Sequence, residues 1–447
     1  MVRDTRRTSP ARGRGELSLY FHFPFCLRKC HYCDFLSFPL AEAPVTPPEY
    51  LTALQKELSL YARFPWLTRK SLRTIYFGGG TPSLAPAPAL NRLLERIRQG
   101  FPVDPAAEIT LEANPGTVDR TKLVLLREAG WNRLSLGAQV FDDRLLARLG
   151  RAHDMAAIQA AFRAARQAGF ANINLDLIFG LPEQDREAWR KTLREAVALG
   201  PEHVSAYPLA IEPGTSFDRF RAAGQLPLPD EEVVLDMWEE AIERLAAAGY
   251  QHYEISNYAR PGYRSRHNLT YWQTGEYLGL GLGSHSCLDW PQDGEEPGTA
   301  APGNSFEAGS SPEELSPAGG QKDLQSGEPG PAASGQEWAA KRRRRFSNHR
   351  KLRNYLSDLE NGRFPLAEVM VLPDEDIRSE AVIMGLRLLE GIDLVEFARR
   401  FQMDLEQAFP GKAEHLRALG LVEIKANHLR LTKRGLFLAN QVMAEFV

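Results

Sequence analysis

The sequence has few of the features that mark secreted, membrane-spanning or nucleic-acid-binding proteins. Only 4 of its 447 residues are cysteine, too few for a disulfide framework in a chain of this length. No apolar run approaches the length of a membrane-spanning helix. The formal net charge of −3 gives no general attraction to nucleic acid or to an anionic membrane. The composition indicates a globular protein with two domains, or with one large domain and appendages.

Two segments have compositions that disfavour a packed core. Residues 1–15 carry five arginines but no apolar signal segment, and they are too short for a transit peptide, so we expect a disordered tail. Residues 291–345 are expected to form a disordered insertion, because Gly, Pro, Ser, Glu and Ala dominate them up to residue 339. The insertion ends in the basic run Lys341–Arg345. This run predicts a solvated patch, and contact with an anionic partner is the less favoured interpretation.

Three of the four cysteines lie within eight residues, in the order CxxxCxxC: Cys26, Cys30 and Cys33. Three thiolates on one tight loop can bind three irons of a [4Fe–4S] cluster, and the fourth iron then stays open to an outside ligand. Zinc is the alternative, with His31 as a fourth ligand that would have to fold back. Three buried structural cysteines are a further alternative. Because an exposed iron–sulfur cluster needs a reducing interior, the motif predicts a cytoplasmic protein.

From residue 17 to about residue 250, short β-rich runs alternate with amphipathic stretches, which indicates repeated β/α units around a parallel sheet. Six units predict an α/β fold of the partial (β/α)6, TIM-like barrel type. Most of the unusual residues follow the C-terminal end of a strand, where α/β folds build their sites. The expected strands are Leu17–Phe23, Arg73–Phe77, Glu108–Glu112, Arg133–Leu136, Asn172–Ile178 and His203–Tyr207.

Helical periodicity returns in the C-terminal part of the chain, residues 346–447. Helices followed by a small hairpin predict a winged-helix-like domain. The division of the chain is therefore expected to be 1–15, 16–290, 291–345 and 346–447. The expected C-terminal elements are helices Ile377–Leu389, Leu394–Phe401 and Ala413–Leu419 and strands Val422–Ile424 and Leu429–Leu431.

Glycines and polar residues at the strand ends outline a pocket beside the cysteine loop. The glycines let the backbone approach a ligand, and the carboxylates can bond ribose hydroxyls or an amino group. Taken singly, each residue also fits a tight turn, a capping acid or the surface. Together they indicate a nucleotide-like ligand. They are Gly79, Gly80, Thr81, Glu112, Asp176, Gln139 and Arg151.

The cysteine loop, the GGGTPS run at 78–83, the run ending in Gln139 and the pair Gly150 and Arg151 resemble radical S-adenosylmethionine enzymes. The run from Asp176 to Pro182 resembles the oxygen-independent coproporphyrinogen III oxidase group. This resemblance implies that Cys26, Cys30 and Cys33 hold a [4Fe–4S] cluster. It also implies that S-adenosyl-L-methionine binds Tyr20, Tyr32, Gly79, Gly80, Thr81, Glu112, Gln139, Arg151 and Asp176, and that its cleavage yields a 5′-deoxyadenosyl radical.

Within this family, two features separate the chain from the oxidases. Those enzymes carry a further cysteine where this chain has Phe35, and the early Cys26 leaves little room for their N-terminal substrate-covering extension. The Cys33 to Phe35 ending and the run His267 to Trp272 resemble HemW-type heme chaperones. That resemblance implies heme as cargo, delivery to heme-requiring proteins such as membrane-bound respiratory enzymes, an electron donor such as flavodoxin or ferredoxin, and no nucleic acid.

Two alternatives to a heme chaperone are retained. One is the oxidase itself, which decarboxylates coproporphyrinogen III through the adenosyl radical. The other is a DNA-binding regulator, which the mixed charges of the C-terminal part disfavour. Because the chain has no CxxCH motif, thioether attachment of heme is not indicated. Candidate axial ligands for heme are His267, His285, Cys287, Tyr271 and His22.

Overall fold

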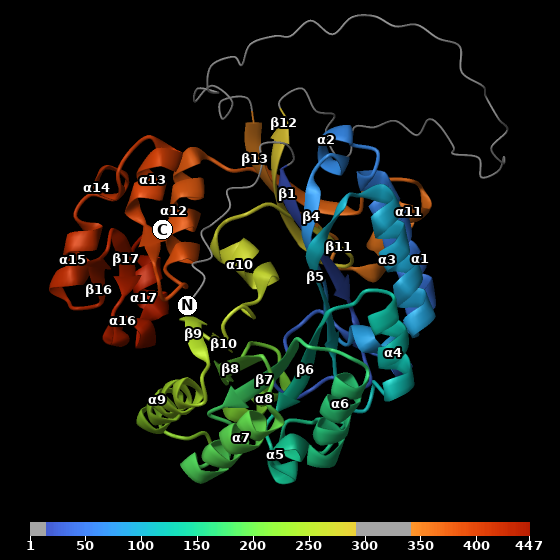
Figure 1. Ribbon diagram of the computed structural model, residues 1–447, viewed down its shortest axis with the longest axis horizontal. Helices are drawn as coiled ribbons and strands as arrows, with labels where there is room; N and C mark the ends of the chain where they lie inside the picture. Colours follow the sequence, from blue (N-terminus) through green and yellow to red (C-terminus); the bar gives the residue numbers. More distant parts are fainter. Residues whose placement is uncertain (1–14, 292–340) are drawn as a thin grey trace, which may run out of the picture.

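The computed structural model describes residues 15–291 and 341–447, in which a curved sheet of 12 strands forms the centre of the protein (Figure 1). Six of these strands alternate with helices along the chain, and each pairs in parallel with the next. The predicted α/β fold is confirmed. The six strands are β1 (Glu16–Phe23), β4 (Ser71–Gly79), β5 (Val103–Ala113), β6 (Arg133–Gln139), β7 (Ile173–Phe179) and β8 (His203–Pro208).

The parallel strands are buried on both faces, and their apolar side chains form the core. Phe21 on β1 stacks on Phe77 of β4 at 4.4 Å between ring centroids, and Phe77 also meets Trp131 at 4.9 Å. Figure 1 shows the connecting helices on the outer side of the curve. They are α1 (Pro47–Tyr61), α3 (Ala87–Gly100), α4 (Arg120–Glu128), α5 (Asp143–Arg148), α6 (Met155–Gln167) and α7 (Arg186–Leu199).

Four of these helices begin at an aspartate, which explains where they start. The carboxylate accepts a backbone hydrogen bond from the first turn in each case, and this bond satisfies one of the free amides there. The N-caps are Asp119 for α4, Asp142 for α5, Asp154 for α6 and Asp185 for α7.

Antiparallel strands extend the sheet at both ends. Beyond β8 lie β10 (Asn257–Ala259) and β9 (Gln251–Glu254), which follow the helices α8 (Ser216–Ala222) and α9 (Glu231–Ala247). Beyond β1, the parallel strand β11 (Tyr277–Leu280) follows α10 (Arg266–Trp272). The sheet then ends with β12 (His285–Pro291), β13 (Lys341–Asn348) and β14 (Leu366–Val371).

The basic run Lys341–Arg345 does not continue a disordered insertion, and this expectation is corrected. These residues open strand β13, which pairs with β12 and β14. Arg343 forms an ion pair with Asp289 at 3.0 Å, and Arg345 pairs with Glu380. Partners on other elements thus compensate two of the positive charges of the strand. Because those partners lie far away in the sequence, the local charge run could not reveal the strand.

Most of the C-terminal elements gather on one side of the sheet, whereas α11 (Leu352–Glu360) lies on the other side, beside α1 (Figure 1). The predicted helices and the hairpin are present, with bounds shifted by a few residues, and a short third strand joins the hairpin in the order β15-β17-β16. The elements are α11 (Leu352–Glu360), α12 (Asp374–Gly385), β15 (Ile392–Asp393), α13 (Leu394–Phe401), α14 (Leu405–Ala408), α15 (Lys412–Ala418), β16 (Val422–Lys425), β17 (His428–Leu431), α16 (Lys433–Phe437) and α17 (Ala439–Ala444).

The expected tail, the expected insertion and the expected division near residue 345 can be compared with the structure only in part. The predicted tail and most of the predicted insertion lie outside the described residues, which begin at residue 15 and omit 292–340. The expected division near residue 345 falls inside β13, and both β13 and β14 belong to the large sheet. Of the helices in the described ranges, none has both the length and the apolar character to cross a bilayer.

Candidate functional site

The cysteine loop follows β1 and is fastened at both ends. Strand β2 (Phe25–Cys26) pairs with β3 (Phe38–Pro39), which brings the two ends of the loop together. Within the loop, the amide of Cys33 donates to the carbonyl of Cys30 at 3.3 Å. All three cysteines of the loop are half-buried free thiols. The loop is therefore a fixed part of the barrel mouth.

The three thiols open into a cavity of about 420 Å³ at the C-terminal ends of the parallel strands. Its volume lies in the usual range for small-molecule sites. The structure gathers here ten of the twelve residues predicted from the sequence to form the site. They are Cys26, Cys30, Cys33, Tyr32, Gly79, Gly80, Glu112, Gln139, Arg151 and Asp176.

The other two predicted residues, Tyr20 and Thr81, do not line this cavity. The Tyr20 ring stacks on Tyr76, which does line it, and the Tyr20 hydroxyl meets Nδ1 of His22 at 3.1 Å. Thr81 is buried, and its hydroxyl points to the Sγ atom of Cys26 at 3.6 Å. Both residues lie one layer behind the wall, where they can orient groups that face the cavity.

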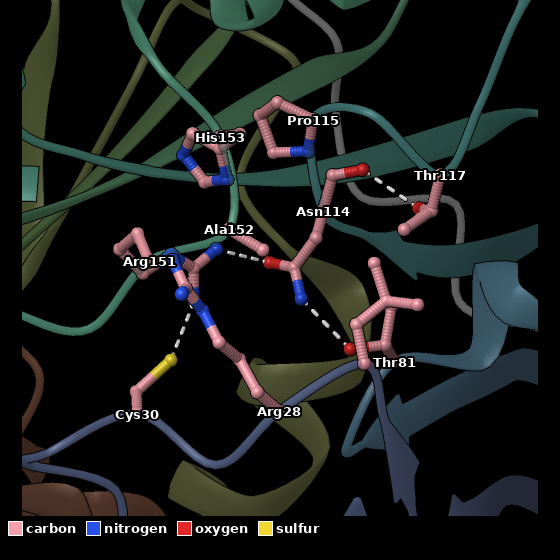
Figure 2. Close-up of a pocket in the computed structure, with 10 residues that line it drawn as sticks. Arg28, Cys30, Thr81, Asn114, Pro115, Thr117, Arg151, Ala152 and His153 are labelled. Carbon is pink, nitrogen blue, oxygen red and sulfur yellow. Dashed lines mark hydrogen bonds between the residues drawn. The ribbon is translucent and has the colours of Figure 1, made fainter. Parts of the chain in front are cut away.

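Hydrogen-bond donors surround the sulfur atoms of the loop. Figure 2 shows Arg151 between Cys30 and Asn114, and Asn114 in turn beside Thr81. The Arg151 guanidinium donates to Sγ of Cys30 at 3.4 Å and to the Asn114 side-chain oxygen. The Asn114 amide donates to the Thr81 hydroxyl at 2.7 Å. Nε of Arg151 is buried without a hydrogen-bond partner, so donor capacity remains near the thiols.

This arrangement fits an iron–sulfur cluster better than a single zinc ion. Each thiolate of a cluster binds a different iron, and donors to sulfur stabilise the anionic assembly. A single ion needs ligands that converge on one point. In the ranges that the structure covers, no three His, Cys, Asp or Glu side chains do so. His31, the candidate fourth zinc ligand, instead hydrogen-bonds the Arg148 carbonyl at 3.0 Å and packs against Phe217 and Phe220.

Two half-buried carboxylates line the same cavity as the thiols. Glu112 accepts hydrogen bonds from the Tyr76 hydroxyl at 2.7 Å and from the Gly79 amide at 3.1 Å. Asp176 accepts from Ser135 at 3.0 Å and from Asn174 at 2.8 Å. Burial raises the pKa of Glu112 to about 7 and also raises the pKa of Asp176. Both carboxyls would therefore gain from a ligand that donates hydrogen bonds or carries positive charge.

The turn after β4 brings the backbone close to the loop. Gly79 has a φ of +107°, and a Cβ atom there would lie 2.7 Å from the His22 ring. A Cβ atom on Gly80 would lie 2.6 Å from the Phe25 carbonyl oxygen. Gln139, at the end of β6, also has a positive φ, of 67°, which is rare outside glycine and typical of functional sites. At Gly79, Gly80 and Gln139 the backbone can therefore pass close to the cysteine loop and the cavity.

Sequence reasoning missed several cavity residues, among them Tyr76, Ser135 and Tyr207. Alternation along β4 could have revealed Tyr76, because residues two apart on a strand share a face and Gly78 lies in the predicted loop. Ser135 lies inside a strand whose seven residues are all buried, so its hydroxyl carries no pattern signal. Tyr207 ends β8, and its position could have been inferred from the other strand ends.

None of the five candidate heme ligands lines the thiol cavity. His267 is buried, and its ring nitrogens bond Thr74 at 2.7 Å and Tyr271 at 2.9 Å. The ring nitrogens of His22 are engaged by Tyr20 and by the Leu36 carbonyl. Cys287 is 2% exposed, whereas His285 is exposed on β12. In the described conformation, these contacts leave neither ring nitrogen of His267 or His22 open to a metal.

Known proteins with similar sequences and structures identify the family. Residues 20–196 match the Radical SAM superfamily, and residues 372–438 match the HemN C-terminal domain. A Bacillus subtilis protein named heme chaperone HemW is 32% identical over 432 residues, which cover 96% of this chain and 99% of that protein. The protein of the same name from Escherichia coli is 43% identical over 280 residues, 62% of this chain and 71% of that protein.

A solved structure supports the fold independently. Coproporphyrinogen III oxidase (HemN) from Escherichia coli, a radical SAM enzyme, superposes with a TM-score of 0.71. The match covers 97% of this chain and 90% of that one, at 23% sequence identity. This match shows the fold, and the sequence matches confirm the family resemblance inferred from the motifs. Because the match to a relative extends along nearly the full length of both chains, the protein belongs to the radical SAM superfamily, in the family of the proteins named heme chaperone HemW.

Proposed function

We propose that this protein is a heme chaperone that uses a radical SAM site. The observation that carries the radical SAM site is the cavity that three thiols, two half-buried carboxylates and Arg151 line together. Membership of the superfamily implies a [4Fe–4S] cluster and S-adenosyl-L-methionine. Cys26, Cys30 and Cys33 would hold the cluster. A reduced cluster, when bound, supplies single electrons to S-adenosyl-L-methionine at the open iron.

The residues of this chain would bind and orient the second cofactor. Glu112 and Asp176 would accept hydrogen bonds from its ribose hydroxyls or its amino group, because burial leaves both carboxyls in need of donors. The backbone at Gly79 and Gly80 would approach it closely, since no side chain stands there. Arg151 would offset the negative charge of the cluster thiolates through its contact with Cys30.

The proposal of heme as cargo is supported by the relatives, which are named heme chaperones. The alternative is oxygen-independent decarboxylation of coproporphyrinogen III. Residue 35 disfavours the decarboxylation, because the coproporphyrinogen III oxidases that this sequence resembles carry a cysteine at that position. In this chain Phe35 lines the cavity with 60% of its surface exposed. An apolar ring thus stands where the oxidases place a thiol.

Heme-requiring proteins, among them membrane-bound respiratory enzymes, would receive the cargo. The exposed rim around Phe35 would let a flavodoxin or ferredoxin approach the cluster. A reducing compartment, the cytoplasm, suits the half-buried thiols.

The test is an anaerobic titration of the cluster-loaded protein with heme, followed by the Soret band. The proposal predicts a saturable shift of the band at one heme per chain. A spectrum equal to that of free heme at every ratio would contradict it. Bovine serum albumin is unsuitable as a control because it binds heme, so lysozyme at equal concentration serves as the protein that should give no shift.

A further inference from the structure

A second cavity lies between the edge of the large sheet and the C-terminal helices. Its volume is about 430 Å³, and its walls come from β12, β13, the residues after β14, the start of α12 and the end of α13. It shares no lining residue with the thiol cavity. The fold therefore presents two separate sites of ligand size.

Positive charge dominates this second cavity. Four arginines line it, Arg342, Arg343, Arg378 and Arg400, against two acids, Asp289 and Asp374. The four positive charges minus the two negative charges leave an excess of two. Arg343 uses Asp289 as its ion-pair partner at 3.0 Å, so that acid is already engaged. The remaining guanidinium groups are available to an anionic ligand.

Three of these arginines, Arg342, Arg378 and Arg400, have no acidic partner among the described residues, and Arg342 is exposed on β13. Among the residues that the structure describes, Arg378 on α12 makes no hydrogen bond or ion pair, although it is only partly exposed. Arg400 on α13 donates to the Thr274 hydroxyl at 2.7 Å and to no carboxylate. Burial and the charge of Arg343 lower the pKa of Arg400. Nearby, Nε of the buried Arg343 has no hydrogen-bond partner. A bound anion would give a hydrogen-bond or ion-pair partner to Arg378, to Arg400 and to Nε of Arg343.

The remaining walls indicate that the ligand is both anionic and apolar. Leu372, Ile377 and Phe401 line the cavity beside the arginines. Helix α12 also begins here, after its N-cap Pro373, but its first turn carries Asp374, Glu375 and Asp376, so the attraction for an anion comes from the arginines. A ligand with an apolar ring system and carboxylate groups at one edge could pack against the apolar side chains and bind the arginines at the same time.

We infer that this cavity, the arginine cavity, binds the propionate carboxylates of heme, with the apolar wall against the ring edge. The inference rests on the proposed function, because it takes heme as the cargo. Three guanidinium groups without acidic partners, on β13, α12 and α13, can bind the two carboxylates of one molecule. The cavity would thus hold the cargo at the C-terminal helices, apart from the thiol cavity.

The first experiment removes charge at a residue that makes no hydrogen bond or ion pair with the described residues. Arg378→Gln in the full-length, cluster-loaded protein should weaken heme binding about tenfold, the usual loss for one charge-assisted hydrogen bond. The double variant R378Q/R400Q should lose more. Arg417→Gln, an exposed arginine on α15 outside the cavity, is the matched control and should bind heme as the wild type does. Equal heme affinity in all four proteins would overturn the inference and leave the proposed function intact.

The second experiment needs no variant and covers the case in which one fails to fold. Heme dimethyl ester keeps the ring and the iron but lacks both carboxylates. The wild type should bind the ester at least tenfold more weakly than heme. The folded double variant should bind the two alike. Equal affinity of the wild type for heme and for the ester would refute the arginine cavity as the carboxylate site. Absence of any heme binding by the wild type would instead overturn the proposed function together with this inference.

Discussion

At the scale of single residues, Glu57 shows how a buried charge joins distant parts of the chain. This fully buried residue of α1 accepts hydrogen bonds from Tyr355 at 2.6 Å, Asn348 at 2.6 Å and the Gly281 amide at 2.8 Å. These donors belong to α11, to the end of β13 and to the turn after β11. Burial nevertheless raises the pKa of Glu57 to about 7.

This raised pKa predicts a stability that falls as pH rises. From the ordinary value of 4.5 up to about 7, the folded state holds the Glu57 proton and the unfolded state does not. The group therefore costs the fold up to about 3 kcal/mol once pH exceeds about 7. Glu57→Gln cannot ionise, so its free energy of unfolding relative to wild type should grow between about pH 5 and about pH 8. Denaturant titrations at both pH values check this, and a difference that does not change with pH would contradict it.

The thiol assignment is also testable one residue at a time. Cys30→Ala should lose the visible absorbance of the cluster and most of its iron after anaerobic reconstitution, because only two loop thiolates remain. Cys287→Ala is the matched control, since that buried thiol lies outside the cavity. It should keep about four irons per chain. Full cluster content in the Cys30 variant would show that Cys30 is not a ligand.

At the scale of elements, the turn after β4 links the backbone to the site. The Gly79 amide holds Glu112, and its φ of +107° together with the nearby His22 ring leaves no room for a side chain. Gly79→Ala should therefore lower the unfolding free energy by about 1–3 kcal/mol more than Gly116→Ala. Gly116 also has a positive φ, of +86°, but open space around it. Similar melting temperatures for the two variants would show that the contact with His22 does not matter.

Elements differed in how well the sequence could predict them. The six parallel strands were predictable because each is a buried apolar run, and their ends then located most of the cavity residues. Strand β13 was not predictable, since its arginines find Asp289 and Glu380 only in the folded chain. The same holds for the arginine cavity, in which Arg378 and Arg400 lie on separate helices. Strand β15, with two residues, is too short for any periodic signal.

At the scale of the whole molecule, one sheet carries two sites of different chemistry. The parallel part ends in thiols and carboxylates, whereas the antiparallel edge and the C-terminal helices supply arginines and apolar side chains. The turn after α10 reaches the arginine cavity, because Thr274 accepts from Arg343 and from Arg400. The same helix places His267 within the barrel. A change at one site therefore has a short structural route toward the other.

The central claim is that this fold carries heme and does not make porphyrin. The most direct measurement is an anaerobic assay of the cluster-loaded protein with coproporphyrinogen III, S-adenosyl-L-methionine and a reductant, with the Escherichia coli oxidase HemN as the positive control. We expect protoporphyrinogen from the control and none from this protein, while the same preparation shifts the Soret band of added heme. Catalytic formation of protoporphyrinogen by this chain would contradict the account.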